Sequence, residues 1–312
     1  MIHCAAARKT ASSVGKKAQA ANGLERQMDW KIGKVKITKI VETAMTGGTR
    51  FILPQATPDA VLTMPWLIPH FASTEGRLKM TVHSLIVETP SRRIVVDTGL
   101  GNDKQGRGLP AWNNLQTPYL AELTEAGYPP ETIDTVICTH LHVDHVGWNT
   151  RLVGGQWVPT FPNARYLFGR TEYEYWRDHS DHPDLAAVFN DSVKPVIDAD
   201  QVDLIPSDAR LWDEIQLIPT PGHSPGHMSL HIQSEGAEAI LTGDVAHHPC
   251  QMAHPDWSAK VDFDPVQSAR SRRELLSRFA DTPTLVMGGH FDAGYIKRVG
   301  HAFKFDLASA PD

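Results

Sequence analysis

The stretch Thr139-His140-Leu141-His142-Val143-Asp144-His145-Val146-Gly147 places four potential metal ligands within six residues. It follows a β-type run, so we expect the cluster where a buried strand ends and the chain turns toward a helix. His140 and His142 are two positions apart and can point the same way, whereas the adjacent Asp144 and His145 must diverge. This spacing suits two metal ions better than one.

The composition of the 312-residue chain is that of an ordinary soluble globular protein, with 41% hydrophobic and 21% charged residues. The formal net charge of −6 argues against a nucleic-acid partner, because phosphate binding normally needs a basic surface. Cys4, Cys138 and Cys250 are too few and too scattered for a disulfide framework. No apolar run is long enough to cross a membrane, so we expect a cytoplasmic protein without a membrane partner.

Residues 1–29 are rich in alanine and serine and carry basic side chains, with no acid before Glu25. They lack the apolar core of a secretory signal. We expect a disordered tail or a docking arm, with a transit-like segment for an organelle as the alternative. Because no low-complexity linker interrupts the rest, residues 30–312 are predicted to form a single domain.

Strands and helices are predicted to alternate through the chain in two similar halves. This order favours two sheets packed together with helices outside them. Strands are expected at 34–41, 80–88, 93–97, 134–139, 164–168, 215–218, 228–232, 239–242 and 284–287. Helices are expected at 116–127, at 171–197 with a break near Pro183, and at 265–279.

The segment 50–77 contains four prolines among many large apolar residues. It is too apolar for an open loop and too rich in proline for a long helix. We interpret it as an apolar lid or a surface for homodimer formation, to which the N-terminal tail could also contribute. Packing of the segment against the protein's own core is an equally good interpretation.

Three further residues of ligand type, His223, Asp244 and His290, stand at predicted strand ends or in the turns that follow them. Each has a neighbouring glycine, which permits a tight turn and a close approach of the backbone to a site. The chain then offers five histidines and two aspartates to two metal ions. Imidazole and carboxylate suit zinc, with manganese, cobalt or iron as alternatives.

This ordered set of motifs resembles that of the metallo-β-lactamase-fold hydrolases over roughly residues 30–305. The resemblance implies an α+β protein with a four-layer αβ/βα sandwich. It also implies that His140, His142 and His223 bind the first metal ion. Asp144, His145 and His290 would then bind the second ion, and Asp244 would bridge the two.

Within this superfamily the pattern looks most like the branch that holds the N-acyl-homoserine-lactone lactonases and methyl parathion hydrolase. Lactonases of the best-known type have a tyrosine three residues after the bridging aspartate, where this chain has His247, as in the phosphotriesterase-like pattern. The resemblance implies a hydrolase that uses a hydroxide held between two metal ions to cleave a lactone, a carboxylic ester or a phosphotriester. His247 or Asp144 is the candidate proton donor to the leaving group, and a surface or supporting role for His247 is the alternative.

Other polar residues are candidates for supporting roles. Asp97, at a predicted strand end, is expected to accept a hydrogen bond from a ligand histidine or from the motif backbone, or else to be a simple turn residue. His227 is predicted to be structural rather than a ligand, and the remaining histidines, including His248, are treated as solvated. Three side chains are candidates for the wall of the substrate pocket, with a place in the core as the alternative: Trp66, His70 and Trp148.

Other activities are known on the same arrangement of ligands. A β-lactamase would need a group that recognises the β-lactam carboxylate, and a glyoxalase-type thioesterase would need an added helical domain; neither is identifiable. A nuclease would need an arm that grips RNA. From another class, the ligands could hold iron in an oxidoreductase. Two zinc-like ions per chain would favour hydrolysis of a small-molecule substrate, whereas a single iron with oxygen consumption would favour the oxidoreductase.

Overall fold

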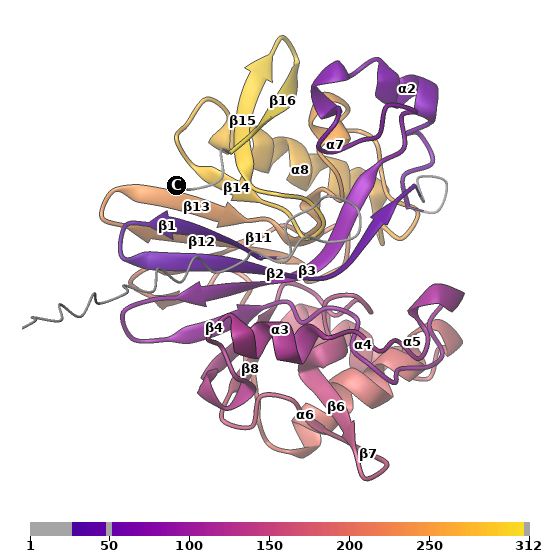
Figure 1. Cartoon of the computed structure of the whole chain (residues 1–312), viewed down its shortest axis with the longest axis vertical. Coiled ribbons are helices and arrows are strands. Elements are labelled where there is room, and N and C mark those ends of the chain that lie inside the picture. The colour runs from indigo at the N-terminus through magenta and orange to yellow at the C-terminus, as the bar shows by residue number, and fades with distance from the viewer. Residues whose placement is uncertain (1–26, 48–51, 309–312) are drawn as a thin grey trace, which may run out of the picture.

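Two seven-stranded sheets account for most of the strands in the computed structural model, which describes residues 27–47 and 52–308 (Figure 1). The first sheet contains, in spatial order, β1 (Gln27–Ile32), β2 (Val35–Thr46), β3 (Lys79–Glu88), β4 (Arg93–Val96), β5 (Thr135–Cys138), β8 (Arg165–Gly169) and β9 (Val202–Ile205). The second contains β10 (Arg210–Trp212), β11 (Ile215–Pro219), β12 (Met228–Ser234), β13 (Ala237–Leu241), β14 (Leu285–Met287), β15 (Gly294–Val299) and β16 (Ala302–Leu307). The hairpin of β6 (Thr150–Val153) and β7 (Gln156–Pro159) stands apart from both sheets.

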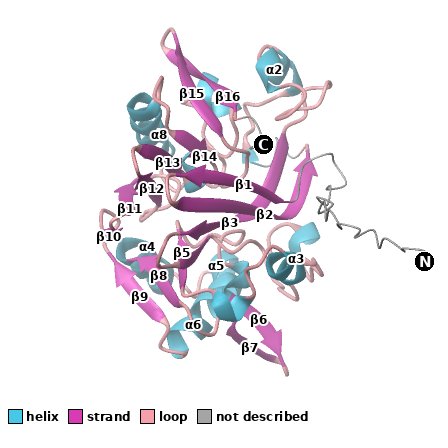
Figure 2. Cartoon of the chain, turned by 60° about the vertical axis from the view of Figure 1, so that its left-hand side comes forward, coloured by secondary structure: helices cyan, strands magenta, loops and turns pink. Residues whose placement is uncertain are grey.

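Helices cover the outer faces of the sheets, so that the molecule has the four layers of an αβ/βα sandwich (Figure 2). Those on the side of the first sheet are α3 (Tyr119–Glu125), α4 (Arg170–Asp178), α5 (Pro183–Val188), the π-helix η5 (Phe189–Val193) and α6 (Lys194–Asp198). Those on the side of the second are α2 (Pro58–Leu62), α7 (Cys250–Ala253) and α8 (Pro265–Phe279). Short 3-10 turns complete the set: η1 (Pro65–Leu67), η2 (Pro110–Trp112), η3 (Pro130–Thr132), η4 (Gly147–Asn149) and η6 (Gly243–Val245).

The layers follow from strands that are apolar on both faces. In β5, Ile137 points into the core between the two sheets, whereas Val136 and Cys138 point to the helical layer. In β13, Leu241 faces the same inter-sheet core and Ile240 faces α8. This alternation is the period of two that a strand imposes on its side chains, and it explains why the strands read as continuous apolar runs.

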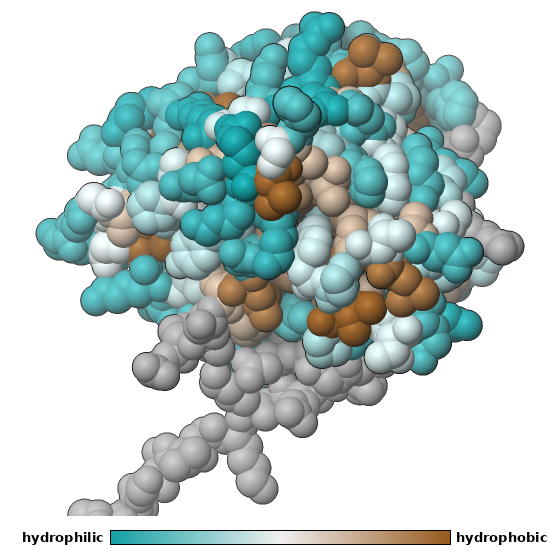
Figure 3. All heavy atoms as spheres, turned by 90° about the horizontal axis from the view of Figure 1, so that it is seen from above, coloured by the Kyte–Doolittle hydropathy of each residue, from teal (hydrophilic) through white to brown (hydrophobic). Residues whose placement is uncertain are grey.

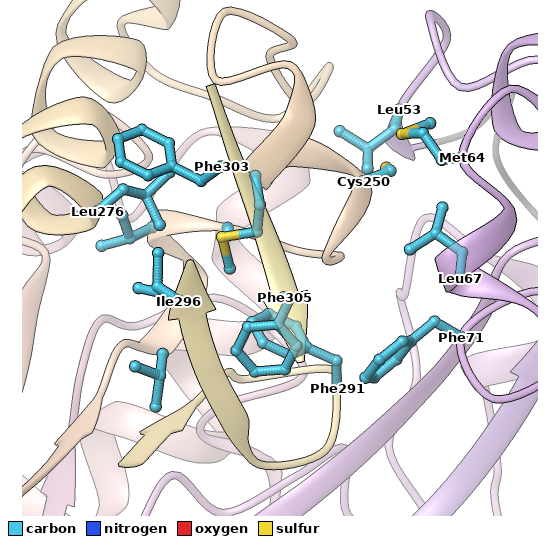
Figure 4. Close-up of a cluster of buried hydrophobic side chains, with 14 of the residues drawn as sticks. Leu53, Met64, Leu67, Phe71, Cys250, Leu276, Phe291, Ile296, Phe303 and Phe305 are labelled. Carbon is cyan, nitrogen blue, oxygen red and sulfur yellow. The ribbon is translucent and has the colours of Figure 1, made fainter. Parts of the chain in front are cut away.

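The segment that follows residue 51 packs against the protein's own second sheet and its helices. Leu53, Leu67 and Phe71 are buried, and Phe71 lies edge-on to Phe305 of β16 with the ring centroids 5.7 Å apart (Figure 4). The segment is therefore part of a core, which was one of the two interpretations of 50–77. Only its first described residue, Ile52, reaches the large cavity described below, so most of the segment is not a lid.

Some boundaries differ from those predicted. The first strand begins at Gln27, three residues inside the predicted tail; the rest of the tail, with Cys4, lies outside the described residues. This strand was missed because it is an edge strand with few buried side chains, paired only with β2. The β15–β16 hairpin was also not predicted. The two described cysteines, Cys138 and Cys250, are both buried and free.

Apolar groups on the molecular surface form small separate patches within a largely hydrophilic face (Figure 3). No helix among the described residues is long and apolar enough to span a bilayer.

Candidate metal centre

The loop after β5 carries the first four predicted ligands, and the neighbouring parallel strand β4 anchors it. Asp97 follows β4, and its carboxylate accepts hydrogen bonds from the backbone N–H and the hydroxyl of Thr139, each at 2.8 Å. The same carboxylate accepts from Nδ1 of His145 at 2.8 Å. Because β4 and β5 are adjacent in the sheet, the carboxylate is held at the point where the motif leaves its strand.

Three histidines from two loops converge at one point. Nε2 of His223, in the loop between β11 and β12, lies 3.1 Å from Nε2 of His140 and 2.8 Å from Nδ1 of His142. Nδ1 of His223 donates to Oδ1 of Asp262 at 2.8 Å, so its Nε2 presents a lone pair. The hydroxyl of Thr139 donates to Asp97 and therefore accepts from Nδ1 of His140 at 3.0 Å, which leaves a lone pair on Nε2 of His140 as well.

A second group of donors surrounds the carboxylate of Asp244, which follows β13. Its Oδ2 lies 3.1 Å from Nε2 of His290 and 3.3 Å from Nε2 of His145. The carboxylate of Asp144 lies 3.8 Å from His145 and 3.5 Å from His290. Asp244 Oδ2 is also 3.5 Å from Nε2 of His223, so this carboxylate lies between the two groups of histidines.

The outer ring nitrogens fix the histidines in the orientation that a metal ion requires. Nδ1 of His290 donates to the backbone oxygen of Thr81 at 2.9 Å, as Nδ1 of His145 does to Asp97. A metal-binding imidazole characteristically gives its second N–H to a carboxylate or carbonyl in this way. In each case the inward nitrogen, Nε2, faces the carboxylate of Asp244, so a cation placed between them would meet a ligand atom on either side.

Charge and burial reinforce this arrangement. Burial lowers the pKa of His140 and His223 well below the ordinary value, so both rings are neutral and can act as ligands. Burial opposes ionisation of Asp244 as well, but the surrounding histidines, His290 first among them, hold its pKa well below the ordinary range. Asp244 Oδ1 and His145 Nε2 are buried without a hydrogen-bond partner among the described residues. Facing lone pairs and orphaned acceptors of this kind fit divalent cations.

His227 and His247 lie beside these groups but differ in their contacts. Nδ1 of His227 pairs with the hydroxyl of Thr220 at 2.9 Å, and its Nε2 accepts from the backbone N–H of Asp244 at 3.0 Å, so both nitrogens are used within the protein. Burial lowers the pKa of His227 to about 3. His247 is equally buried, yet neither of its ring nitrogens has a hydrogen-bond partner among the described residues, and Nε2 lies 3.2 Å from Asp244 Oδ2.

A cavity of about 460 Å³ opens over the two groups. Its lining includes His142, Asp144, His223, Asp244, His247 and His290. The predicted pocket residues Trp66, His70 and Trp148 are not part of the lining. The Trp148 ring is buried and donates its indole N–H to Glu42 at 2.7 Å, while His70 pairs with Asp292 at 2.6 Å.

The expectation that His248 is solvated is wrong. This side chain is fully buried, and its Nε2 donates to the backbone oxygen of Phe71 at 2.8 Å. His70 and His254 are half-buried. Two buried acids next to the centre, Asp262 and Glu172, were not singled out from the sequence. Each lies far along the chain from the loop that it contacts, so no local motif identifies it.

Comparison with known proteins supplies an independent view. A family model described as the Metallo-beta-lactamase superfamily matches residues 79–290. The N-acyl homoserine lactonase AiiA of Bacillus thuringiensis subsp. kurstaki is 27% identical over 232 residues, which are 70% of this chain and 85% of the relative. N-acyl homoserine lactonase AttM of Rhizobium radiobacter is 28% identical over 242 residues, 68% of this chain and 82% of the relative.

Solved structures share the fold along nearly their whole length. AidC, a dizinc quorum-quenching lactonase in complex with a product, superposes with a TM-score of 0.74 and 21% identity, covering 92% of this chain and 98% of its own. The hydrolase AbOPH of the beta lactamase superfamily superposes with a TM-score of 0.75 and 19% identity, covering 93% and 99%. At these identities the likeness concerns the fold, which agrees with the predicted α+β sandwich.

Proposed function

This chain belongs to the metallo-beta-lactamase superfamily and is a metal-dependent hydrolase, and we propose that it opens an uncharged lactone, or a related ester, that carries an apolar chain. The observation that carries the proposal is the cavity, which joins the candidate metal centre to an apolar wall. The similarity of this chain to N-acyl homoserine lactonases favours a lactone over other esters.

The wall of the cavity determines which ligands are compatible with it. It is built largely from apolar and aromatic side chains: Met45, Ile52, Met80, Val82, Leu109, Trp112, Val143, Tyr175, Trp176, Leu185, Val188, Val261 and Phe263. None of the described lining residues is a lysine or an arginine, and Asp144 and Asp244 are acidic. A ligand carboxylate that lies against this wall, such as that of a β-lactam, would therefore be desolvated without a cationic side chain as partner, whereas an acyl or aryl group would bury apolar surface.

We propose that His140, His142 and His223 hold one divalent ion and that Asp144, His145 and His290 hold another, with Asp244 between them. Zinc suits these nitrogen and oxygen donors best. When bound, two such ions supply a nucleophile at neutral pH and polarise the substrate carbonyl. The chain's own contribution is to orient the imidazoles, through Asp97 and the other outer partners.

His247 is our candidate for the proton donor. Lactone hydrolysis adds the hydroxyl of water to the carbonyl carbon, breaks the bond from that carbon to the ring oxygen, and delivers a proton to that oxygen. His247 lines the cavity and is buried, and within the part of the chain that the structure describes neither of its ring nitrogens has a hydrogen-bond partner. Asp144 is the second candidate, but its carboxylate already faces His145 and His290.

A screen of the metal-loaded protein tests the proposal. It would compare homoserine lactones of increasing acyl length with aryl esters, neutral phosphotriesters and a chromogenic β-lactam, and metal analysis would accompany it. We expect two ions per chain and the highest kcat/KM on a neutral substrate with an apolar chain. Turnover confined to the β-lactam would contradict the proposal, as would a single iron with oxygen consumption.

If the neutral phosphotriesters were turned over and the lactones were not, the ester class would be revised and the metal chemistry would stand. A cytoplasmic location and homodimer formation through the tail or residues 50–77 stay predictions from the sequence.

A further inference from the structure

Glu172 is a buried acid in the first turn of α4 whose contacts all lead toward the candidate metal centre. Its side chain is 1% exposed. Oε1 accepts from the backbone N–H of Leu141 at 3.1 Å and from the indole N–H of Trp176 at 2.9 Å. Oε2 accepts from the backbone N–H of Gly226 at 2.9 Å. One carboxylate thus connects two loops and a wall of the cavity.

The two loops are those that carry the three converging histidines. Leu141 lies between His140 and His142, and Gly226 lies in the turn after His223. These histidines come from sequence positions far apart. The N–H of Met228 donates to the backbone oxygen of Thr139 at 3.0 Å and joins the bases of the two loops, but no backbone hydrogen bond joins residues 140–142 to residues 223–226. Glu172 therefore supplies a direct link between the two ligand loops at this end of the site.

The backbone at Gly226 is shaped for this contact. A Cβ atom at this position would lie 2.2 Å from the backbone nitrogen of Glu172 and 2.7 Å from its Cα. Only glycine allows the loop to approach α4 so closely. The loop and the start of the helix are therefore fitted to one another at the point where the carboxylate binds.

No ion pair to Glu172 is present among the described residues. Burial raises the pKa of Glu172 above its ordinary value, and the N–H donors only reduce this rise. Every hydrogen bond described above is donated to the carboxylate, so the ionised form satisfies all of them. Burying a carboxylate without a counter-ion is costly, which a dication bound to the adjacent histidines would offset. Trp176, which donates to Glu172, also contacts one of these histidines: its ring lies edge-on to that of His142, with the ring centroids 5.9 Å apart.

We propose that Glu172 is a positioning residue that ties the two loops of the His140, His142 and His223 group together and thereby sets the affinity of this group for its metal ion. The inference rests on the ligand set of the proposed function. It assigns to Glu172 no contact with the substrate.

The test compares isosteric variants of the full-length protein. In Glu172→Gln the side-chain amide must turn its NH2 toward the N–H groups of one loop, so at least one loop is released and the charge is lost. Glu42→Gln is the matched control: Glu42 is also buried and also accepts from backbone N–H groups and an indole, but these belong to Leu100, Gly101 and Trp148. Chelator titration of the zinc form, the visible spectrum of the cobalt form, and metal-free unfolding would be measured for each.

We expect Glu172→Gln to release one of its two ions at about 10- to 100-fold lower chelator concentration than the wild type, with an altered cobalt spectrum. Glu42→Gln should keep both ions, even if it lowers the stability of the metal-free protein as much as Glu172→Gln does. Glu172→Asp, which keeps the charge but is one methylene too short to reach both loops, should also weaken one ion and carries the test if the glutamine variant does not fold.

Wild-type metal affinity in Glu172→Asp, or equal metal loss in Glu42→Gln, would overturn the inference. These results are distinct from a failure of the proposed function, because a wild-type protein that binds no metal would overturn the ligand set itself. A wild type with two ions and Glu172 variants that match it would overturn the inference alone.

Discussion

Replacing His248 by glutamine should change how the stability of the protein depends on pH. The imidazole of His248 is fully buried; its Nε2 donates to the backbone oxygen of Phe71, and its Nδ1 accepts from the backbone N–H of Cys250 at 3.1 Å. Both nitrogens are used by the neutral ring, so a second proton would face an N–H donor. Burial accordingly lowers the pKa of His248 from 6.5 to about 4.

The size of the effect follows from this difference. Below pH 6.5 the histidine of the unfolded chain takes up a proton that the folded protein excludes until pH falls to about 4, so acid favours unfolding. The stability contribution of the neutral ring is complete above pH 6.5 and is lost as pH falls through this window. Each pH unit in the window costs about 1.4 kcal/mol, which gives roughly 2 kcal/mol between pH 8 and pH 5.

Urea unfolding of the metal-free protein at several values from pH 8 to pH 5 would measure this contribution. At pH 8 His248→Gln should be less stable than the wild type by about 1–3 kcal/mol, because a buried group loses its partner. The difference in unfolding free energy between the two proteins should narrow by roughly 2 kcal/mol at pH 5, because only the wild type has the His248 contribution to lose. The other histidines titrate in both proteins and cancel in the comparison. His254→Gln is the control, because His254 is only half-buried and should give a smaller change. Parallel stability curves for the wild type and His248→Gln would refute the reasoning.

Three further variants test other parts of the structure. Asp262→Asn removes the carboxylate that orients His223 and should weaken binding of one metal ion by about 10- to 100-fold, measured by chelator competition. Lys39→Met leaves the carboxylate of Asp292 buried without its ammonium and should cost about 3–5 kcal/mol in urea unfolding, whereas a small loss would show that the pair is not needed. His247→Asn should lower kcat and change its dependence on pH while leaving the metal content at two ions; an unchanged pH profile would exclude His247 as the proton donor.

The elements that the sequence predicted well are those with strong local signals. Helix α8 spans Pro265–Phe279 as predicted, because Asp264 caps its N-terminus by accepting from the backbone N–H groups of Val266 and Gln267, and Pro265 starts the first turn. The edge strand β1 has no comparable signal. It pairs with β2 through a tight turn at Gly33, but only Trp30 and Ile32 of its side chains are buried, so the local pattern was too weak to separate it from the tail.

The predicted ligands and their partners differ in the same way. His223, Asp244 and His290 could be selected because each is a metal-binding type of residue beside a glycine near a strand end, and His140 because it stands in the dense motif that follows a strand. Glu172 could not, because an acid in the first turn of a helix is usual on a solvated surface, and its inward direction depends on loops far away in the sequence.

The direction in which a side chain points also explains why the sequence did not identify the residues that line the pocket. Trp148 was selected because it follows the motif, but the short turn η4 directs its ring back onto Tyr119, with the two rings stacked at 5.4 Å. Trp176 and Tyr175, which do line the cavity, lie on α4 and in the sequence look like ordinary residues of an amphipathic helix. The same apolar and aromatic residue types occur in a cavity wall and in a core, and only the packing of distant segments distinguishes the two locations.

The candidate metal ligands and the residues of the cavity wall are held in place by different parts of the fold. The candidate ligands stand at the ends of strands whose register is fixed by two buried sheets. Moving one ligand would require its strand to shift against its neighbours in the sheet. Much of the cavity wall instead comes from α4, α5 and the loops near Leu109 and Phe263, and Phe263 is 58% exposed. Substitutions there remove little core packing. We therefore expect Phe263→Ala to change the preference for substrate chain length with little loss of stability, and a loss of all activity in this variant would contradict the separation.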